Sequence, residues 1–458
     1  MHNVDIDLVD MAMDVMKFAI NRITDVDPVL GFPKKESELR ELVGETVTPK
    51  GIGGEKAFQL FRDVLLKSSI SIDHRRHLAF VPASPTRSAV MFDLVTSASS
   101  IHGAFWLEGA GGIFAENQAM EWLVKLTGMP AGAFGVFTSG GTEGNLSALV
   151  TAREAWRAAH ADRAATRGLI ITSDGAHSSI RSMAKVIDAD ILAVPTEERF
   201  EGAQLRTAID ELTHEDRSRL FAVIAAGGTT NAGIVDDLAG LADVAEAEGL
   251  WFHVDAAYGG GALAAPSVRH LFDGIERADS VTIDPHKWFF STYDCGAVIY
   301  RRPELARAAH AQKGSYLDAF NESAYAGFNP SDYQIQLTRR LRGLPLWFSL
   351  AMHGTDRYTT AIERGIELAQ NAASQIDALE YVELVRAPSL SCVLFRRLGW
   401  SPEDYFQWSY KNHKAGFALV TPTKFGRGGG EKETVARFCF INPDTTEKDI
   451  ADILVTMQ

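Results

Sequence analysis

Two stretches of the 458-residue chain place residues that could react with an aldehyde just beyond apolar runs. Asp255 follows the apolar run at 250–254, and Lys287 comes shortly after the run at 281–283. Parallel strands buried on both faces are near-continuous apolar runs, and open α/β sheets bind ligands beyond the carboxyl ends of their strands. A lysine can form an imine with the aldehyde of pyridoxal phosphate, and an aspartate can hold its pyridine nitrogen protonated. The pair therefore predicts a site for this cofactor.

A structural role is the alternative, since buried Asp–Lys pairs can be structural and a lysine after a histidine is usually a surface residue. The neighbours of Lys287 indicate burial, because they are Pro285, Trp288, Phe289 and Phe290. Lysine is rarely buried without a partner, and burial lowers its pKa from ~10.4 towards values suited to attack on an aldehyde. We therefore expect a functional lysine with a lowered pKa.

Other expected strand ends also carry polar or glycine-rich groups. Gly141 and Thr142 lie in a turn at 138–145 before a long helix, where free N–H groups and the helix dipole favour an anion such as phosphate. His177 follows the run at 169–172 and could stack on a flat ring or cap the next helix. Thr230 follows the run at 220–226 and could offer a hydroxyl to a ligand or serve as a turn residue. Together these positions favour one ligand site.

The composition of the chain argues against several other classes of protein. A net charge of −14 disfavours non-specific binding to nucleic acid and to anionic membrane surfaces. The three cysteines are widely spaced, which indicates neither a disulfide framework nor a metal site but buried thiols in a reducing compartment. No secretory signal pattern and no apolar run near the ~18 residues of a membrane span is found. We expect a cytoplasmic protein without a metal.

The apolar runs alternate with helical patterns, which is typical of a doubly wound α/β sheet. The predicted strands are residues 134–137, 169–172, 191–194, 220–225, 250–254, 280–283 and 297–300. Helices are expected at 115–126 and, broken at Pro345, at 335–352. Helical patterns at 5–22 and 55–68 have too few apolar residues for a core of their own and predict packing on a partner subunit. The expected units are a helical dimerisation segment at 1–75, a large cofactor-binding domain at 76–350 and a small α+β domain at 351–458.

These motifs together resemble one known family. The segments 253–258 (HVDAAY) and 284–288 (DPHKW) are similar to those of the group II pyridoxal-phosphate-dependent amino-acid decarboxylases, such as the aromatic-L-amino-acid, glutamate and histidine decarboxylases. The segments 176–179 (AHSS), 228–230 (GTT), 278–280 (ADS) and 294–296 (DCG) extend the resemblance in the same order. It implies the fold type I architecture of aspartate aminotransferase, with a seven-stranded, mostly parallel sheet. It also implies a homodimer with active sites at the subunit boundary, which converts an L-amino acid to its amine and carbon dioxide.

The resemblance also implies roles for individual residues. Lys287 would hold pyridoxal phosphate as an internal aldimine, and Asp255 would pair with the pyridine nitrogen and stabilise the quinonoid. His177 would stack over the ring, with Ala257 against its other face. The remaining contacts would be Thr230 near the phenolic oxygen, Gly141 and Thr142 on the phosphate, and His286 beside phosphate and substrate.

Two segments depart from the family pattern. The family protonates its product through a loop tyrosine, and a gapless comparison back from residues 334–340 puts Pro330 there; a small shift would restore Tyr333 or Tyr325. Phe80 retains the aromatic residue of the substrate pocket in aromatic decarboxylases. His102 stands where those enzymes have a bulky apolar group, which indicates a more polar or smaller substrate side chain, or a solvated interface residue.

Three kinds of function remain open at this point. The leading interpretation is decarboxylation of an L-amino acid. A decarboxylating aldehyde synthase or a carbon–carbon lyase on the same scaffold is the second, because related enzymes without the loop tyrosine make aldehydes. The third is a non-enzymatic protein that binds the cofactor or a nucleotide.

Overall fold

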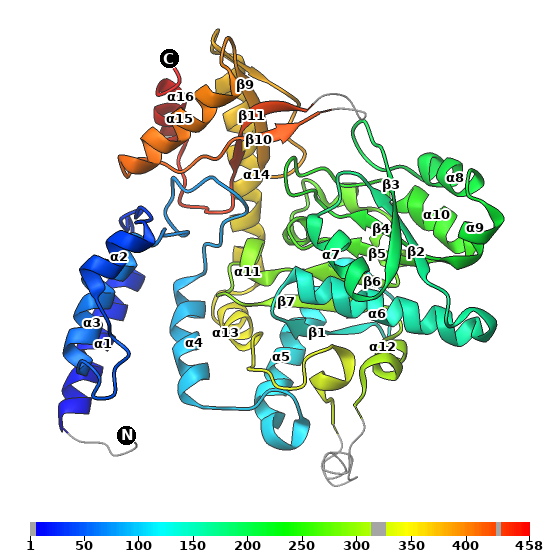
Figure 1. The fold of residues 1–458 in the computed structure, drawn as a ribbon, viewed down its shortest axis with the longest axis horizontal. Coiled ribbons are helices and arrows are strands. Elements are labelled where there is room, and N and C mark those ends of the chain that lie inside the picture. Colours follow the sequence, from blue (N-terminus) through cyan, green and yellow to red (C-terminus); the bar gives the residue numbers. More distant parts are fainter. Residues whose placement is uncertain (1–5, 313–326, 427–431) are drawn as a thin grey trace.

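The centre of the molecule is one large sheet. In the computed structural model, which describes residues 6–312, 327–426 and 432–458, its strands are β1 (Phe134–Thr138), β2 (Gly168–Ser173), β3 (Ala189–Val194), β4 (Leu220–Ala226), β5 (Trp251–Asp255), β6 (Ser280–Ile283) and β7 (Gly296–Tyr300). They lie in the order β1-β7-β6-β5-β4-β2-β3 (Figure 1). Strands β2 to β6 are parallel, and β7 is antiparallel to β6 and β1. All seven predicted strands are present, and the predicted fold class is confirmed.

Helices cover both faces of this sheet, as a doubly wound fold requires. On one face α6 (Gly141–Ala159) packs against β4 to β7, with α7 (Ser178–Val186) and α12 (Pro303–His310) beside it. On the other face lie α10 (Leu238–Glu248) and α8 (Gly202–Asp210), and α5 (Trp106–Thr127) packs on β1. The neighbours Ile170 and Ile171 of β2 are both fully buried, in the apolar clusters of opposite faces. Both faces of the sheet are therefore shielded from water, which explains the continuous apolar runs in the sequence.

A second, smaller unit follows in the chain. Its antiparallel sheet has the order β10 (Thr423–Phe425), β11 (Glu433–Cys439), β9 (Cys392–Arg397) and β8 (Val382–Leu384). The helices α14 (Thr355–Asp377), α15 (Pro402–Lys414) and α16 (Glu447–Val455) accompany it. This is the predicted α+β unit, with the short strand β10 as an addition.

The N-terminal helices lie apart from the large sheet. They are α1 (Ile6–Thr24), α2 (Glu36–Val43) and α3 (Gly54–Leu60), and they stand beside α4 (Arg87–Ala98) at the left of Figure 1. Phe18 of α1 meets Phe58 of α3 edge to face, with 5.6 Å between ring centroids. The exact boundaries of the three predicted units stay a prediction.

Two helix expectations were wrong in their limits. Residues 335–343 are not helical, and α13 runs only from Leu344 to His353, with Pro345 in its first turn. Proline has no N–H to donate and is tolerated at that point of a helix, so it marks a start here and not a break. Helix α5 also begins earlier than expected, at Trp106. Within the described ranges, no helix is long and apolar enough to cross a membrane.

Candidate active site

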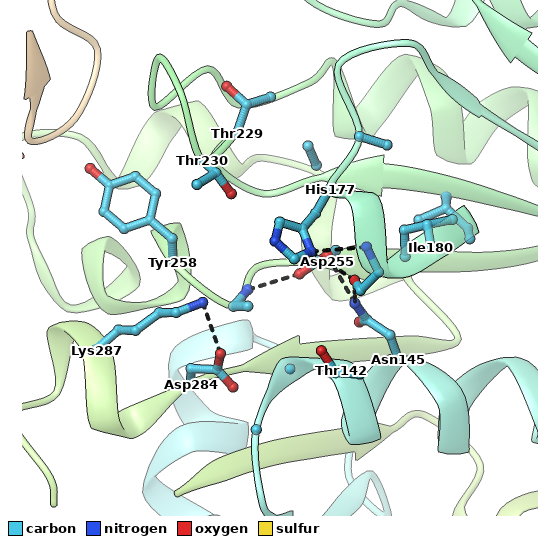
Figure 2. A pocket seen from close by; sticks show the side chains of 18 of the residues that line it. Thr142, Asn145, His177, Ile180, Thr229, Thr230, Asp255, Tyr258, Asp284 and Lys287 are labelled. Atoms are coloured by element: carbon cyan, nitrogen blue, oxygen red, sulfur yellow. Dashed lines mark hydrogen bonds and ion pairs between the residues drawn. The ribbon is translucent and has the colours of Figure 1, made fainter. Parts of the chain in front are cut away.

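A cavity of about 320 Å³ opens at the carboxyl ends of the large sheet's parallel strands. Its walls come from the start of α6, the start of α7 and the segments that follow β4, β5 and β6 (Figure 2). All the residues predicted to bind the cofactor line it: Gly141, Thr142, His177, Thr230, Asp255, Ala257, His286 and Lys287. The strand ends that looked separate in the sequence therefore form one site.

Lys287 reaches the cavity from α11 (Pro285–Trp288), directly after β6. Its Nζ lies 2.9 Å from Oδ2 of Asp284, which is itself buried. Burial lowers the pKa of Lys287, but the charge and hydrogen bond of Asp284, with a smaller contribution from Asp255, raise it to above the usual value. The expectation of a lowered pKa was wrong because it left out this carboxylate in the same turn.

Asp255 is fixed by a hydrogen bond to each of its carboxylate oxygens. The backbone N–H of Ala257 donates to Oδ1 over 3.1 Å, and Nδ2 of Asn145 on α6 donates to Oδ2 over 2.9 Å (Figure 2). Each oxygen keeps a further lone pair. The carboxylate can therefore accept one more N–H from the cavity without losing its present partners.

His177 serves as the cap of α7 and also borders the cavity. Its Nδ1 accepts the backbone N–H of Ser179 over 3.2 Å and lies 2.8 Å from the hydroxyl of Ser179. Nδ1 thus acts as an acceptor, which leaves the ring proton on Nε2. His177 and Asp255 line the same cavity (Figure 2). The two roles that the sequence left open for His177 are therefore compatible.

The start of α6 forms an anion cradle. Gly141 opens the helix and Thr142 follows in its first turn, where backbone N–H groups are free and the dipole is positive. A Cβ at Gly141 would lie 2.9 Å from Cβ of Ala257 and 3.0 Å from Oδ2 of Asp284, so only glycine fits there. His286 closes the same side of the cavity and bonds through Nδ1 to the carbonyl of Cys295, 2.7 Å away.

These groups fit pyridoxal phosphate. The free N–H groups and Thr142 hydroxyl suit its phosphate, Lys287 suits its aldehyde, and Asp255 suits its ring nitrogen. Glycine at position 141 lets the start of α6 lie close to Ala257 and Asp284. Among the described residues, no cluster of three or more His, Cys, Asp or Glu side chains could hold a metal ion.

Comparison with known proteins decides the family. The pyridoxal-dependent decarboxylase conserved domain matches residues 49–398. The chain belongs to this family. It is 30% identical to an aromatic-L-amino-acid decarboxylase of Bacillus atrophaeus over 433 residues, which cover 92% of the chain and 88% of that relative. It is 29% identical to a phenylacetaldehyde synthase of Petunia hybrida over 69% of the chain and 65% of that protein.

The fold of this pyridoxal-dependent decarboxylase is shared with solved structures. The crystal structure of Oryza sativa TDC with PLP and tryptamine superposes with a TM-score of 0.90, at 23% identity, over 100% of this chain and 99% of that one. The group II resemblance, the fold type I architecture and the pyridoxal phosphate cofactor are confirmed. The protein is a pyridoxal-phosphate-dependent carboxy-lyase.

Three other predicted residues do not line the cavity of their own chain. Tyr333 is half-buried and stacks on Phe328, with 4.6 Å between ring centroids. Phe80 is 62% exposed and adopts a positive φ of 55°. His102 bonds through Nδ1 to Oε2 of Glu108 over 2.5 Å. Tyr325, the other candidate for protonation, lies outside the described residues.

Sequence reasoning gave no role to several residues of this decarboxylase that border the cavity, among them Asn145, Tyr258 and Asp284. Asp284 carried a usable signal, since it follows the β6 run just as Asp255 follows the run before it. Asn145 lies one helical turn after Gly141, inside the glycine-rich segment already singled out. Tyr258 ends the segment 253–258 that carried the resemblance, and its hydroxyl lies 2.6 Å from Oγ of Ser391 next to the smaller sheet.

Proposed function

We propose that this decarboxylase removes the α-carboxylate of an L-amino acid and releases the corresponding amine and carbon dioxide. The observation that carries the proposal is the meeting of Lys287, Asp255 and His177 around one cavity at the strand ends (Figure 2). The bound cofactor supplies an aldehyde carbon that captures the substrate amine and a ring that accepts the electrons of the breaking bond.

Each residue of the site has a proposed task. Lys287 holds the cofactor between turnovers and yields its place to the substrate amine. Asp255 keeps the ring nitrogen protonated, so that electrons are accepted most readily as the carboxylate leaves, which lowers the barrier more than it tightens binding. His177 would cover one face of the ring and Ala257 the other, which would orient the bond to be broken and exclude water. Thr230 would contact the phenolic oxygen, and Gly141, Thr142 and His286 would hold the phosphate.

We further propose a homodimer that acts in the cytoplasm. Val9, Met13, Met16 and Ile20 of α1 lie on one helical face and are 38–66% exposed, which is unfavourable in water unless a second copy covers them. Phe80, His102 and Tyr333 lie outside their own chain's cavity, as expected if sites form at the subunit boundary. The free, buried thiols of the three cysteines fit a reducing compartment.

Aldehyde synthesis is the second candidate function. It is favoured by Pro330, which stands where a gapless comparison with the family places the protonating tyrosine. A site without a tyrosine to protonate the product would leave it open to oxygen, giving an aldehyde, ammonia and peroxide in place of an amine.

The test is product analysis with purified, cofactor-loaded protein and individual L-amino acids. Release of carbon dioxide with one equivalent of amine supports decarboxylation, whereas aldehyde with ammonia and peroxide supports the second candidate. Lys287→Ala should abolish both and the borohydride-sensitive colour, while Lys411→Ala on the exposed side of α15 should change neither. Carbon dioxide release that survives Lys287→Ala would refute the proposed role of this lysine.

A further inference from the structure

A buried chain of hydrogen bonds runs along β5 and ends at Asp255. Trp251, His253 and Asp255 alternate along the strand, so their side chains share the face that α6 covers. Nε1 of Trp251 lies 2.8 Å from Oγ of Ser280, and that oxygen lies 2.8 Å from Nδ1 of His253. Nε2 of His253 is 2.9 Å from Oδ1 of Asn145, whose Nδ2 is 2.9 Å from Oδ2 of Asp255.

The donor and the acceptor of every hydrogen bond in this series can be assigned. The carboxylate of Asp255 can only accept, so Asn145 turns its N–H to it and its Oδ1 to Nε2 of His253, which donates. Nδ1 of His253 then accepts the hydrogen of the Ser280 hydroxyl, whose oxygen accepts from the indole of Trp251. Burial lowers the pKa of His253 to about 4, against the opposing charge of Asp255, so near neutral pH the ring carries one proton, on Nε2. That proton points at Oδ1 of Asn145, which leaves the amide's N–H for Asp255.

The residues that form this series of hydrogen bonds are buried, which restricts their rotation. His253 and Ser280 have no exposed surface, Asn145 is 1% exposed, and His253 is paired with Ser280 across neighbouring strands. An amide that lost its partner on one side would leave a buried polar group unsatisfied, which is costly. The rotation of Asn145, and with it the plane of the Asp255 carboxylate, is therefore set from the far end of β5.

We infer that Asn145 and His253 are positioning residues, which hold the Asp255 carboxylate in the one orientation that accepts the ring nitrogen of the cofactor. The inference rests on the proposed role of Asp255. Asn145 touches the carboxylate directly, and His253 acts through Asn145. Neither residue is placed on the phosphate or the aldehyde, so their loss should weaken recognition of the ring nitrogen alone.

The experiment compares two compounds on protein freed of cofactor. Dissociation constants are measured for pyridoxal 5′-phosphate and for its analogue with a carbon in place of the ring nitrogen. Wild type should prefer the first. Asn145→Ala should reduce that preference by roughly tenfold, the scale of one hydrogen bond to a charged group, and leave binding of the analogue unchanged. Melting temperatures without cofactor are recorded alongside.

Variants of His253 separate positioning from simple packing. His253→Phe keeps a ring but has no donor, and it should lose preference; His253→Gln keeps an N–H near Nε2 and should restore it. In the double variant Asn145→Ala with His253→Phe, the second change should add nothing. Ser147→Ala is the matched control, since Ser147 is fully buried on α6 and its hydroxyl has no hydrogen-bond partner among the described residues.

The outcomes are distinct. Equal weakening of both compounds by Asn145→Ala would overturn the inference in favour of a general distortion of the site, and no weakening would overturn it as well. If His253→Phe does not fold, Asn145→Ala and His253→Gln still decide the matter. Wild type that binds both compounds equally would instead refute the role of Asp255, and wild type that binds neither would refute the cofactor site itself.

Discussion

Two carboxylates raise the pKa of Lys287, and Asp284 does so more strongly than Asp255. Asp284 is buried and lies 2.9 Å from the lysine amine. Asp255 accepts hydrogen bonds from Asn145 and Ala257 instead. A lysine so paired stays an ammonium to higher pH. The residue that we propose to form the imine is thus held as an ammonium, which does not attack an aldehyde, by its neighbour in the same turn.

Asp284→Asn should lower the pKa of Lys287. The amide removes the charge that opposes burial, so the effect of burial, which disfavours the ammonium, prevails. The measurement is the pH dependence of Lys287 acylation in cofactor-free protein, followed by peptide mass spectrometry. Asp294→Asn is the control, since that carboxylate is 46% exposed and pairs with Arg342 over 3.1 Å. An unchanged Lys287 profile in Asp284→Asn would contradict the argument.

At the scale of single residues, the sequence predicts which residues line the cavity but not which side chains they pair with. Asp255 and Lys287 could be predicted because each follows an apolar run that only a buried strand explains. The pairing of Lys287 with Asp284 and of Asp255 with Asn145 could not, because side-chain rotamers and the docking of α6 decide it. For that reason the expected sign of the pKa shift at Lys287 was wrong, although Lys287 does line the cavity.

At the scale of elements, α6 does two things at once. Its first turn, which begins at Gly141, is the proposed phosphate site, and one turn later Asn145 donates a hydrogen bond to Asp255. The two functions are therefore rigidly linked through one helix, and its distance from the sheet matters for both. That distance is small at the start of α6, where a Cβ at Gly144 would lie 2.9 Å from the Cγ2 methyl of Thr282 on β6.

Gly141→Ala should weaken cofactor binding. The added methyl would meet Ala257 at 2.9 Å and Asp284 at 3.0 Å, so the start of α6 must move away from the segments after β5 and β6. We expect the affinity for pyridoxal phosphate to fall by tenfold or more, roughly the cost of an overpacked contact. Gly111→Ala on α5 is the matched control, because a Cβ there has nothing within 4 Å. Titration of cofactor-free protein by absorbance measures both, and equal affinities in the two variants would contradict the prediction.

Helices and strands could be predicted where the pattern of buried apolar residues sets their limits. They could not be predicted where contacts with distant parts of the chain set those limits. The seven strands of the large sheet were recognisable because both of their faces are dry. The helix at 335–352 was overextended because its first residues are amphipathic enough for a helix, yet Arg339 there is drawn into a buried pair with Glu116. Pro345 then marks the start of α13, a distinction that needs the contacts of the folded chain.

At the scale of the whole molecule, the protein looks incomplete as a single chain. One face of α1 is apolar and exposed, and three residues expected at the substrate stand outside the cavity of their own subunit. Both facts follow if a second copy covers α1 and brings its own segments towards the cavity. The sequence predicted this arrangement in two ways, through the weak apolar content of the N-terminal helices and through the family resemblance.

Ile20→Asp should therefore dissociate the protein and inactivate it together. Ile20 is 55% exposed on the apolar face of α1, where a buried, unpaired charge would be very costly in a dimer but nearly harmless in a monomer. Light scattering at micromolar concentration should give the mass of one chain for the variant and twice that for wild type, with activity rising again at higher protein concentration. Asn21→Asp adds the same charge roughly 100° around the helix and should leave mass and activity unchanged. A monomeric wild type with full activity would contradict the shared site and return the search for the missing substrate contacts to a single chain.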